Sequence, residues 1–177
     1  MIETSPLQIS PSILFLPSEK VPGAILAWIK NNSSKIPMFG DMTINMQCDL
    51  DGQCGVYVCF EPKSHRPLYV GKATSRSFLE RVPSHCDPRE ESWFGTMTSR
   101  VLKYKHTRSR VEASNWLRRN TKVCLLPVSG ECAKADTARI ETLLRRPSPI
   151  GLEPAWNTSN PKNSKHEVEP NKALVSF

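Results

Sequence analysis

The chain has 177 residues, a formal net charge of +7 and a sequence pI of about 9.2. This length fits one domain with an added arm, and it is enough to bury a hydrophobic core. The charge is uneven, because residues 1–54 carry a net charge of −2 and residues 55–177 carry +9. The basic balance favours a polyanionic partner, nucleic acid first, bound by the second part of the chain.

The cysteine spacing and the lack of long apolar runs argue against a zinc site, a secreted protein and a membrane protein. No C-x-x-C pair occurs among Cys48, Cys54, Cys59, Cys86, Cys124 and Cys132, which argues against a zinc site. The opening "MIETSPLQISPS" lacks the basic and apolar regions of a signal peptide, so we expect reduced thiols in a cytoplasmic protein. No apolar run approaches the length that spans a bilayer, so we expect no membrane association.

Residues 1–53 are expected to form an arm that packs on the domain. Ser and Pro are frequent in the first twenty residues, with one apolar run, "ILFL", at 13–16. "PGAILAWIKNN", from Pro22, predicts a short helix, because proline suits the first turn and two asparagines end the segment. The arm is interpreted either as a packing extension or as a specificity arm. Its acidic balance and its lack of reactive residues favour the packing extension.

Residues 54–158 are expected to form the main domain. "CGVYVCF" at 54–60 and "PLYVG" at 67–71 are β-branched and aromatic runs around a polar turn, which predicts an antiparallel hairpin. "TKVCLLPV" at 121–128 is almost continuously apolar, which is typical of a central strand. Helices are expected at 77–85, where Pro83 breaks the segment, and at 97–106, 112–120 and 134–146. Residues 147–157 read as irregular, and the polar tail, 159–177, is expected to be flexible.

Two short motifs stand on the predicted hairpin. "GVY" ends at Tyr57, and after eleven residues "YVG" begins at Tyr69. Each triplet is common, and either tyrosine alone would pass for an ordinary strand aromatic. Four polar residues follow in order, each of them commonplace by itself: Arg81, His85, Glu141 and Asn157. The order and spacing of all six elements resemble the GIY-YIG nuclease family over residues 54–158.

The resemblance implies a small α/β (α+β) domain with a three-stranded antiparallel or mixed sheet flanked by helices. It implies Mg²⁺ or Mn²⁺ as cofactor, with Glu141 as the metal ligand, and carboxylate oxygen suits such hard cations. It implies Tyr57 as the general base. A phenol is a poor base at neutral pH, so Lys72 and the metal are expected to lower the pKa of Tyr57.

The other matched residues receive supporting roles from the same resemblance. Arg81 is expected to hold phosphate oxygens with two donors. Tyr69 and His85 are expected to orient phosphate or water, and Asn157 to position Glu141 or the substrate. Gly55 and Gly71, in the two triplets, are expected to let backbone or DNA approach closely.

"YVGKA" and the short chain are most similar to the small stand-alone GIY-YIG restriction endonucleases. The predicted function is therefore metal-dependent, site-specific cleavage of double-stranded DNA by a homodimer, associated with the nucleoid through DNA. Excision-repair nuclease subunits also read "YVGKA". A repair or homing nuclease therefore stays open, as does a catalytically silent DNA-binding module on the same fold.

A basic segment lies between the motifs. Residues 99–120 hold seven Lys/Arg and one acidic residue. Such a run is often a solvated face, but its place between the motifs favours phosphate contacts. The leading candidates for DNA binding are Lys103, Arg108 and Arg110.

Overall fold

The computed structural model describes residues 8–42, 54–90, 96–148 and 151–157. The predicted flexible tail lies outside these residues. The described elements follow in chain order: η1 (Pro11–Phe15), α1 (Val21–Asn32), η2 (Phe39–Asp41), β1 (Cys54–Phe60), β2 (Pro67–Ala73), α3 (Phe78–Ser84), α4 (Thr96–Tyr104), α5 (Arg110–Asn120), β3 (Lys122–Val128) and α6 (Ala133–Leu144). In this part of the chain, five α-helices surround one three-stranded antiparallel sheet, so the predicted mixed α/β class is confirmed.

The sheet has the order β2-β1-β3. The predicted antiparallel hairpin is confirmed as β1 and β2, with Tyr57 opposite Gly71 and Cys59 opposite Tyr69. Residues that lie opposite each other share a face of the sheet, and so do residues two apart on one strand. Tyr57 and Tyr69 therefore project from the same face.

The prediction that residues 121–128 form the central strand is wrong, because β1 is central and β3 lies at the edge. The arm explains the apolar sequence of β3. Gln8 bridges Leu125, the Ile9 N–H donates to the Leu125 carbonyl at 2.7 Å, and Met38 bridges Lys122. The arm thus covers the outer edge of β3, and the strand is buried from Val123 to Val128 as a central strand would be.

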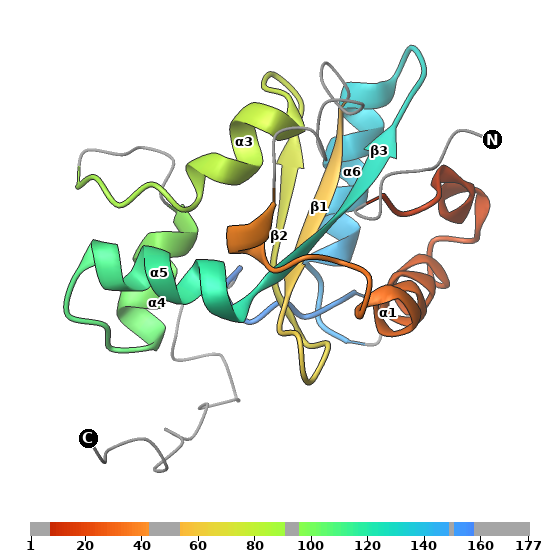
Figure 1. The fold of residues 1–177 in the computed structure, drawn as a ribbon. Helices are drawn as coiled ribbons and strands as arrows, with labels where there is room; N and C mark the ends of the chain where they lie inside the picture. The colour runs from red at the N-terminus through yellow and green to blue at the C-terminus, as the bar shows by residue number, and fades with distance from the viewer. Residues whose placement is uncertain (1–7, 43–53, 91–95, 149–150, 158–177) are drawn as a thin grey trace.

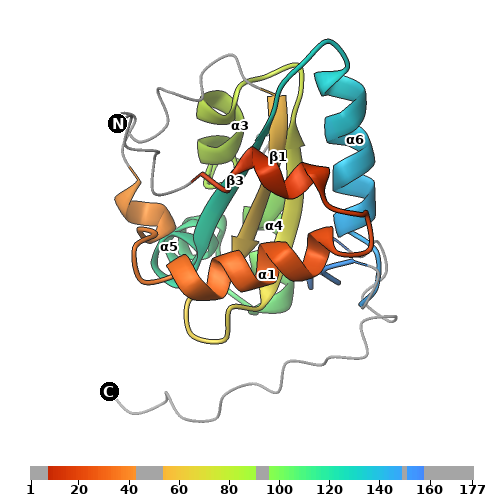
Figure 2. The same ribbon diagram turned by 90° about the vertical axis from the view of Figure 1, so that its right-hand side faces the viewer.

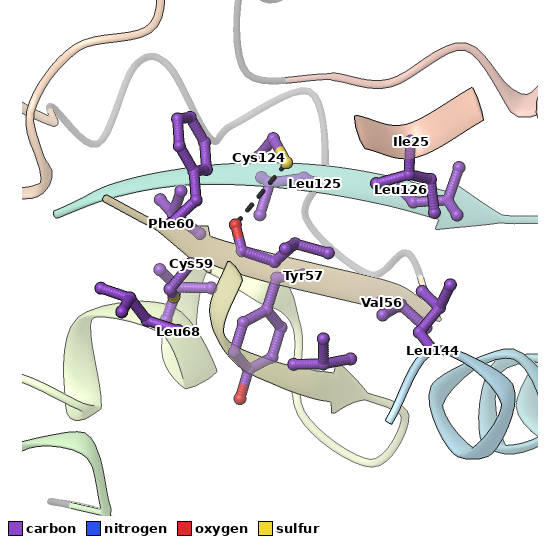
Figure 3. Close-up of a cluster of buried hydrophobic side chains, with 14 of the residues drawn as sticks. Ile25, Val56, Tyr57, Cys59, Phe60, Leu68, Cys124, Leu125, Leu126 and Leu144 are labelled. Atoms are coloured by element: carbon purple, nitrogen blue, oxygen red, sulfur yellow. Dashed lines mark hydrogen bonds between the residues drawn. The ribbon is translucent and has the colours of Figure 1, made fainter. Parts of the chain in front are cut away.

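The helices form two layers on the sheet. Helices α3, α4 and α5 lie on one side, and α1 and α6 lie on the other (Figures 1 and 2). Figure 3 shows the Tyr57 ring below β1, on the face opposite to Ile25 and Leu126. The two faces of β1 thus have different roles, since one packs on α1 and α6 while the other carries the tyrosine.

The predicted helices are found, with shifted ends. α3 begins after Ser77, whose hydroxyl accepts the Glu80 N–H while the Glu80 carboxylate accepts the Ser77 N–H. α5 is longer than predicted, because Ser109 accepts the Glu112 N–H and starts the helix at Arg110. Among the described residues, no helix has the length and apolar character to cross a membrane. The five described cysteines are free thiols.

Candidate active site

Four of the predicted site residues come together between β1, β2 and α3, and we call them the tyrosine cluster: Tyr57, Tyr69, Arg81 and His85. The ring centroids of Tyr57 and Tyr69 are 6.2 Å apart. His85, just after α3, places Nε2 2.5 Å from the Tyr57 hydroxyl, and its ring lies 5.3 Å from that of Tyr69. The sequence predicted this grouping but not the Tyr57–His85 hydrogen bond.

The glycines of both triplets make room for rings of the protein itself. A Cβ on Gly71 would clash with the ring and hydroxyl of Tyr57 on the neighbouring strand. A Cβ on Gly55 would clash with Phe78 of α3 and with the Leu126 carbonyl. The close approach expected at these glycines is therefore made by a catalytic candidate and by the helix that carries Arg81.

Burial dominates the acidity of both phenols. It raises the pKa of Tyr57 well above the usual value of 10, and the nearby Arg81 guanidinium opposes that rise by charge and hydrogen bonding. Burial also raises the pKa of Tyr69, again opposed by Arg81. Tyr57 is fully buried, whereas Tyr69 and Arg81 are only half-buried. Arg81 and Tyr69 are therefore the members of the cluster that solvent reaches.

Lys72 does not act on Tyr57 as the sequence predicted. Lys72 lies opposite Val56, so it projects from the other face of the sheet, toward α6. Its Nζ lies 3.0 Å from the Glu141 Oε2. The cation that lowers the pKa of Tyr57 is Arg81 instead.

Glu141 lies at the centre of a second group, which we call the carboxylate cluster: Lys72, Glu141 and Arg145. The Glu141 carboxylate is almost buried on the sheet side of α6, and Arg145 Nη1 lies 3.6 Å from its Oε1. The Glu141 carboxylate raises the pKa of Tyr69, and Arg145 lowers it. The two clusters therefore lie within electrostatic range of each other, with Tyr69 nearest to their boundary.

Asn157 holds strand β2 rather than Glu141. Its side-chain oxygen accepts the Val70 N–H at 2.6 Å, and its side-chain nitrogen donates to the Val70 carbonyl at 2.7 Å. The Trp156 N–H donates to the Leu68 carbonyl at 2.7 Å, so this segment covers the outer edge of β2. Arg145 Nη2 donates to the Asn157 carbonyl at 3.3 Å, which links Asn157 to Glu141 indirectly. The sequence prediction missed Arg145 as this connection.

Glu141 is the residue that fits a divalent cation. In the part of the chain that the structure describes, no group of three His, Cys, Asp or Glu is arranged to hold a metal ion. One carboxylate with a phosphate oxygen and water molecules is a set of hard ligands that Mg²⁺ accepts. The ammonium of Lys72 already neutralises this carboxylate, so the two cations would compete for it.

Of the three residues predicted to bind DNA, two are exposed and one is half-buried. Lys103 is exposed on α4, and Arg108 is exposed in the turn before α5. Arg110 is half-buried and donates from Nη1 to the Ser99 hydroxyl at 3.0 Å. Arg108 lines a hollow at this turn, whose lining does not include the other two.

No protein-family model, no curated protein and no solved structure matches the chain. The function is therefore argued from the residues and their geometry.

Proposed function

We propose that the protein is a metal-dependent DNA endonuclease of the GIY-YIG type that hydrolyses phosphodiester bonds in double-stranded DNA. The observation that carries the proposal is that four side chains gather on one face of the hairpin: Tyr57, Tyr69, Arg81 and His85. Glu141 is close enough for its charge to raise the pKa of Tyr69. We further propose a site-specific restriction enzyme of the cytoplasm, because the net charge of +7 suits a DNA substrate and "YVGKA" resembles that group of GIY-YIG enzymes.

Substrate phosphate would bind at the solvent-accessible side of the tyrosine cluster. Arg81 is half-buried there and lies close to both phenols. A guanidinium presents two parallel donors to phosphate oxygens, so Arg81 suits this contact. The half-buried Tyr69 would contact the same phosphate from β2.

Tyr57 would act as the general base with His85 as its proton acceptor. Its raised pKa means that the resting phenol is neutral, and a standing phenolate is not available. The 2.5 Å contact with His85 Nε2 gives the phenol proton a destination while the phenol oxygen takes a proton from water. When phosphate draws Arg81 away from Tyr57, water would gain access to that oxygen.

Glu141 would hold the metal, after Lys72 has turned from the carboxylate toward the phosphate. When bound, the divalent cation would stabilise the negative charge that develops on the phosphate oxygens. Lys72, with a 40% exposed side chain, is free enough to make such a move.

A DNA-binding module without cleavage is the second candidate. The complete burial of Tyr57 and the pairing of Glu141 with two cations favour it, because both would silence the site. The two functions differ in one measurable property, which is strand cleavage in the presence of Mg²⁺.

The test is single-turnover cleavage of varied duplex DNA, with and without Mg²⁺, followed by sequencing of the ends. We expect Mg²⁺-dependent cuts by the wild type and, for Tyr57→Phe and Glu141→Gln, a loss of about 10²-fold or more. DNA affinity should persist in both variants. Glu131→Gln, at an exposed position before α6, is the matched control for Glu141→Gln and should cleave like the wild type. Full activity in excess chelator, or in Glu141→Gln, would contradict the metal role.

A further inference from the structure

A hollow of about 580 Å³ lies at the turn between α4 and α5, away from the residues assigned to catalysis. It is lined by four basic side chains and one indole: Lys105, His106, Arg108, Arg119 and Trp116. Of its lining residues only Glu112 is acidic, and the Glu112 Oε2 already accepts the Arg108 backbone N–H at 2.6 Å. The hollow therefore carries a strong positive charge.

The positive charge of the hollow is not neutralised by the protein. None of the salt bridges among the described residues includes Lys105, Arg108 or Arg119. Lys105 Nζ lies 5.0 Å from the centroid of the Trp116 ring, which is a cation–π contact. Three cations around the single carboxylate of Glu112 keep a net positive charge, and a bound anion would reduce the repulsion that remains.

One polar group that lines the hollow also lacks a hydrogen-bond partner among the described residues. It is the buried hydroxyl of Thr107. A buried polar group without a partner costs about 1–3 kcal/mol. Added hydrogen-bond acceptors, with a small adjustment of the turn, would lower this cost.

The Trp116 wall of the hollow packs against the segment that covers the outer edge of β2. The Trp116 ring contacts the Trp156 ring edge-on, with centroids 6.0 Å apart. The Trp156 N–H donates a hydrogen bond to the carbonyl of Leu68, which precedes Tyr69 on β2. A polyanion extending from the tyrosine cluster over this edge would reach the α4–α5 turn.

We propose that this hollow is a second phosphate-binding site, which holds a backbone phosphate of duplex DNA away from the bond that is cut. The inference rests on the proposed function, because it takes DNA as the substrate. The hollow adds Lys105 and Arg119 to Arg108, whereas Lys103 and Arg110, which were also predicted from sequence, do not line it.

The test compares two triple variants that remove the same charge. The hollow variant is Lys105→Gln, Arg108→Gln and Arg119→Gln; the control is Lys20→Gln, Lys30→Gln and Lys35→Gln, all exposed in the arm. Affinity for a labelled duplex is measured by anisotropy in chelator, at about 50 to 200 mM salt. The slope of log K against log salt should lose about 0.9 of its magnitude in the hollow variant, because the three cations together hold one phosphate. The control should keep the wild-type slope.

Equal slopes for the hollow variant and the control would overturn the proposal, provided that circular dichroism shows both folded. Titration with inorganic phosphate is the second arm. Tight, saturable binding that displaces no DNA and disappears in the hollow variant would assign the hollow to a free anion, which also overturns it. Cleavage is measured separately. If the wild type binds DNA through the hollow but never cuts it, the proposed nuclease function is wrong and the proposed phosphate site is supported.

Discussion

Tyr57 and Tyr69 come from two similar triplets, yet the hairpin gives them different surroundings. Tyr57, on the central strand β1, packs against Gly71 of β2 and is fully buried. Tyr69, on the edge strand β2, is half-buried. Burial raises the pKa of both phenols, more strongly for Tyr57. An acid–base role for Tyr57 therefore depends on the partner that receives its proton.

The raised pKa of Tyr57 predicts a specific loss of stability in alkali. The folded state favours the neutral phenol, so Tyr57 makes its full contribution to the free energy of unfolding at pH values below the unfolded pKa, near 10. It is lost progressively as the pH rises above 10 toward the folded pKa. Urea unfolding across this range should show a steeper loss of stability for the wild type than for Tyr57→Phe. If the two proteins lose stability in parallel as the pH rises, the raised pKa of Tyr57 is contradicted.

Lys72 is expected to weaken metal binding in the absence of DNA. Its Nζ lies 3.0 Å from the Glu141 carboxylate, so a divalent cation has to displace it. In Lys72→Met that competition is gone, and the affinity for Mn²⁺, measured by electron paramagnetic resonance, should rise by about tenfold, or 1.4 kcal/mol. Lys30→Met, on the exposed face of α1, is the control. An affinity that is unchanged or lower in Lys72→Met would refute the competition.

Strand β2 depends at its outer edge on a short segment from the far end of the described chain. Asn157 supplies both the donor and the acceptor that a neighbouring strand would give to Val70. This pairing keeps β2, and with it Tyr69, aligned with β1. It also fixes the carbonyl that receives Arg145, so both clusters depend on it.

Asn157→Ala should therefore destabilise the fold by about 2–3 kcal/mol. Two hydrogen bonds of roughly 0.5–1.5 kcal/mol each are lost, and the polar groups of Val70 are left partly desolvated. Chemical denaturation measures the change. Asn31→Ala, at an exposed position of α1, should cost less than about 0.5 kcal/mol. Equal effects of the two substitutions would show that the Asn157 pairing contributes nothing.

The elements show what the sequence could and could not predict. The hairpin and α6 follow from local patterns of β-branched, aromatic and amphipathic residues. The alternation along a strand also predicts the face of Lys72, because Tyr69 and Lys72 are three residues apart and so project from opposite faces. The motif predicts Lys72 beside Tyr57 instead, and the structure agrees with the alternation.

Long-range pairs were beyond local patterns. The burial of β3 at the edge of the sheet depends on Gln8 and Met38, which lie far before it in the chain. The pairing of Asn157 with Val70 spans 87 residues. The basic run at 99–120 was visible, but which cations gather depends on how the α4–α5 turn folds. Charge counting therefore singled out the segment but could not show that Lys105 and Arg119 line the same hollow as Arg108.

For the whole molecule, the arm both completes the core and leaves an apolar face. Ile25 and Ile29 are fully buried, and residues 8 and 9 cover β3, which agrees with a packing extension. Phe15 is nevertheless 89% exposed, and it lines a groove of about 670 Å³ between η1 and α6 together with Leu16 and Leu143. Large exposed aromatic groups of this kind often mark contacts with another chain.

The homodimer expected on DNA would use this face. One active site cuts one strand, so an enzyme that cuts both strands of a symmetric site usually brings two chains related by a two-fold axis. We propose that Phe15 and Leu16 contribute to that contact, since the exposed apolar side chains of the arm are otherwise unexplained. Light scattering should then detect two wild-type chains on one duplex site.

Phe15→Ser with Leu16→Ser should leave one chain on each duplex and convert double-strand breaks into nicks, because the second active site is no longer held in place. The fold should survive, since the Phe15 side chain is almost fully exposed. Val111→Ser, at a 58% exposed position of α5, removes a similar apolar group elsewhere and should preserve the dimer. The measurements are light scattering with the catalytically inactive Glu141→Gln background and plasmid cleavage with the active one. A wild type that stays monomeric on DNA and still breaks both strands in one event would refute the dimer, and a double variant that still assembles would remove Phe15 and Leu16 from the contact.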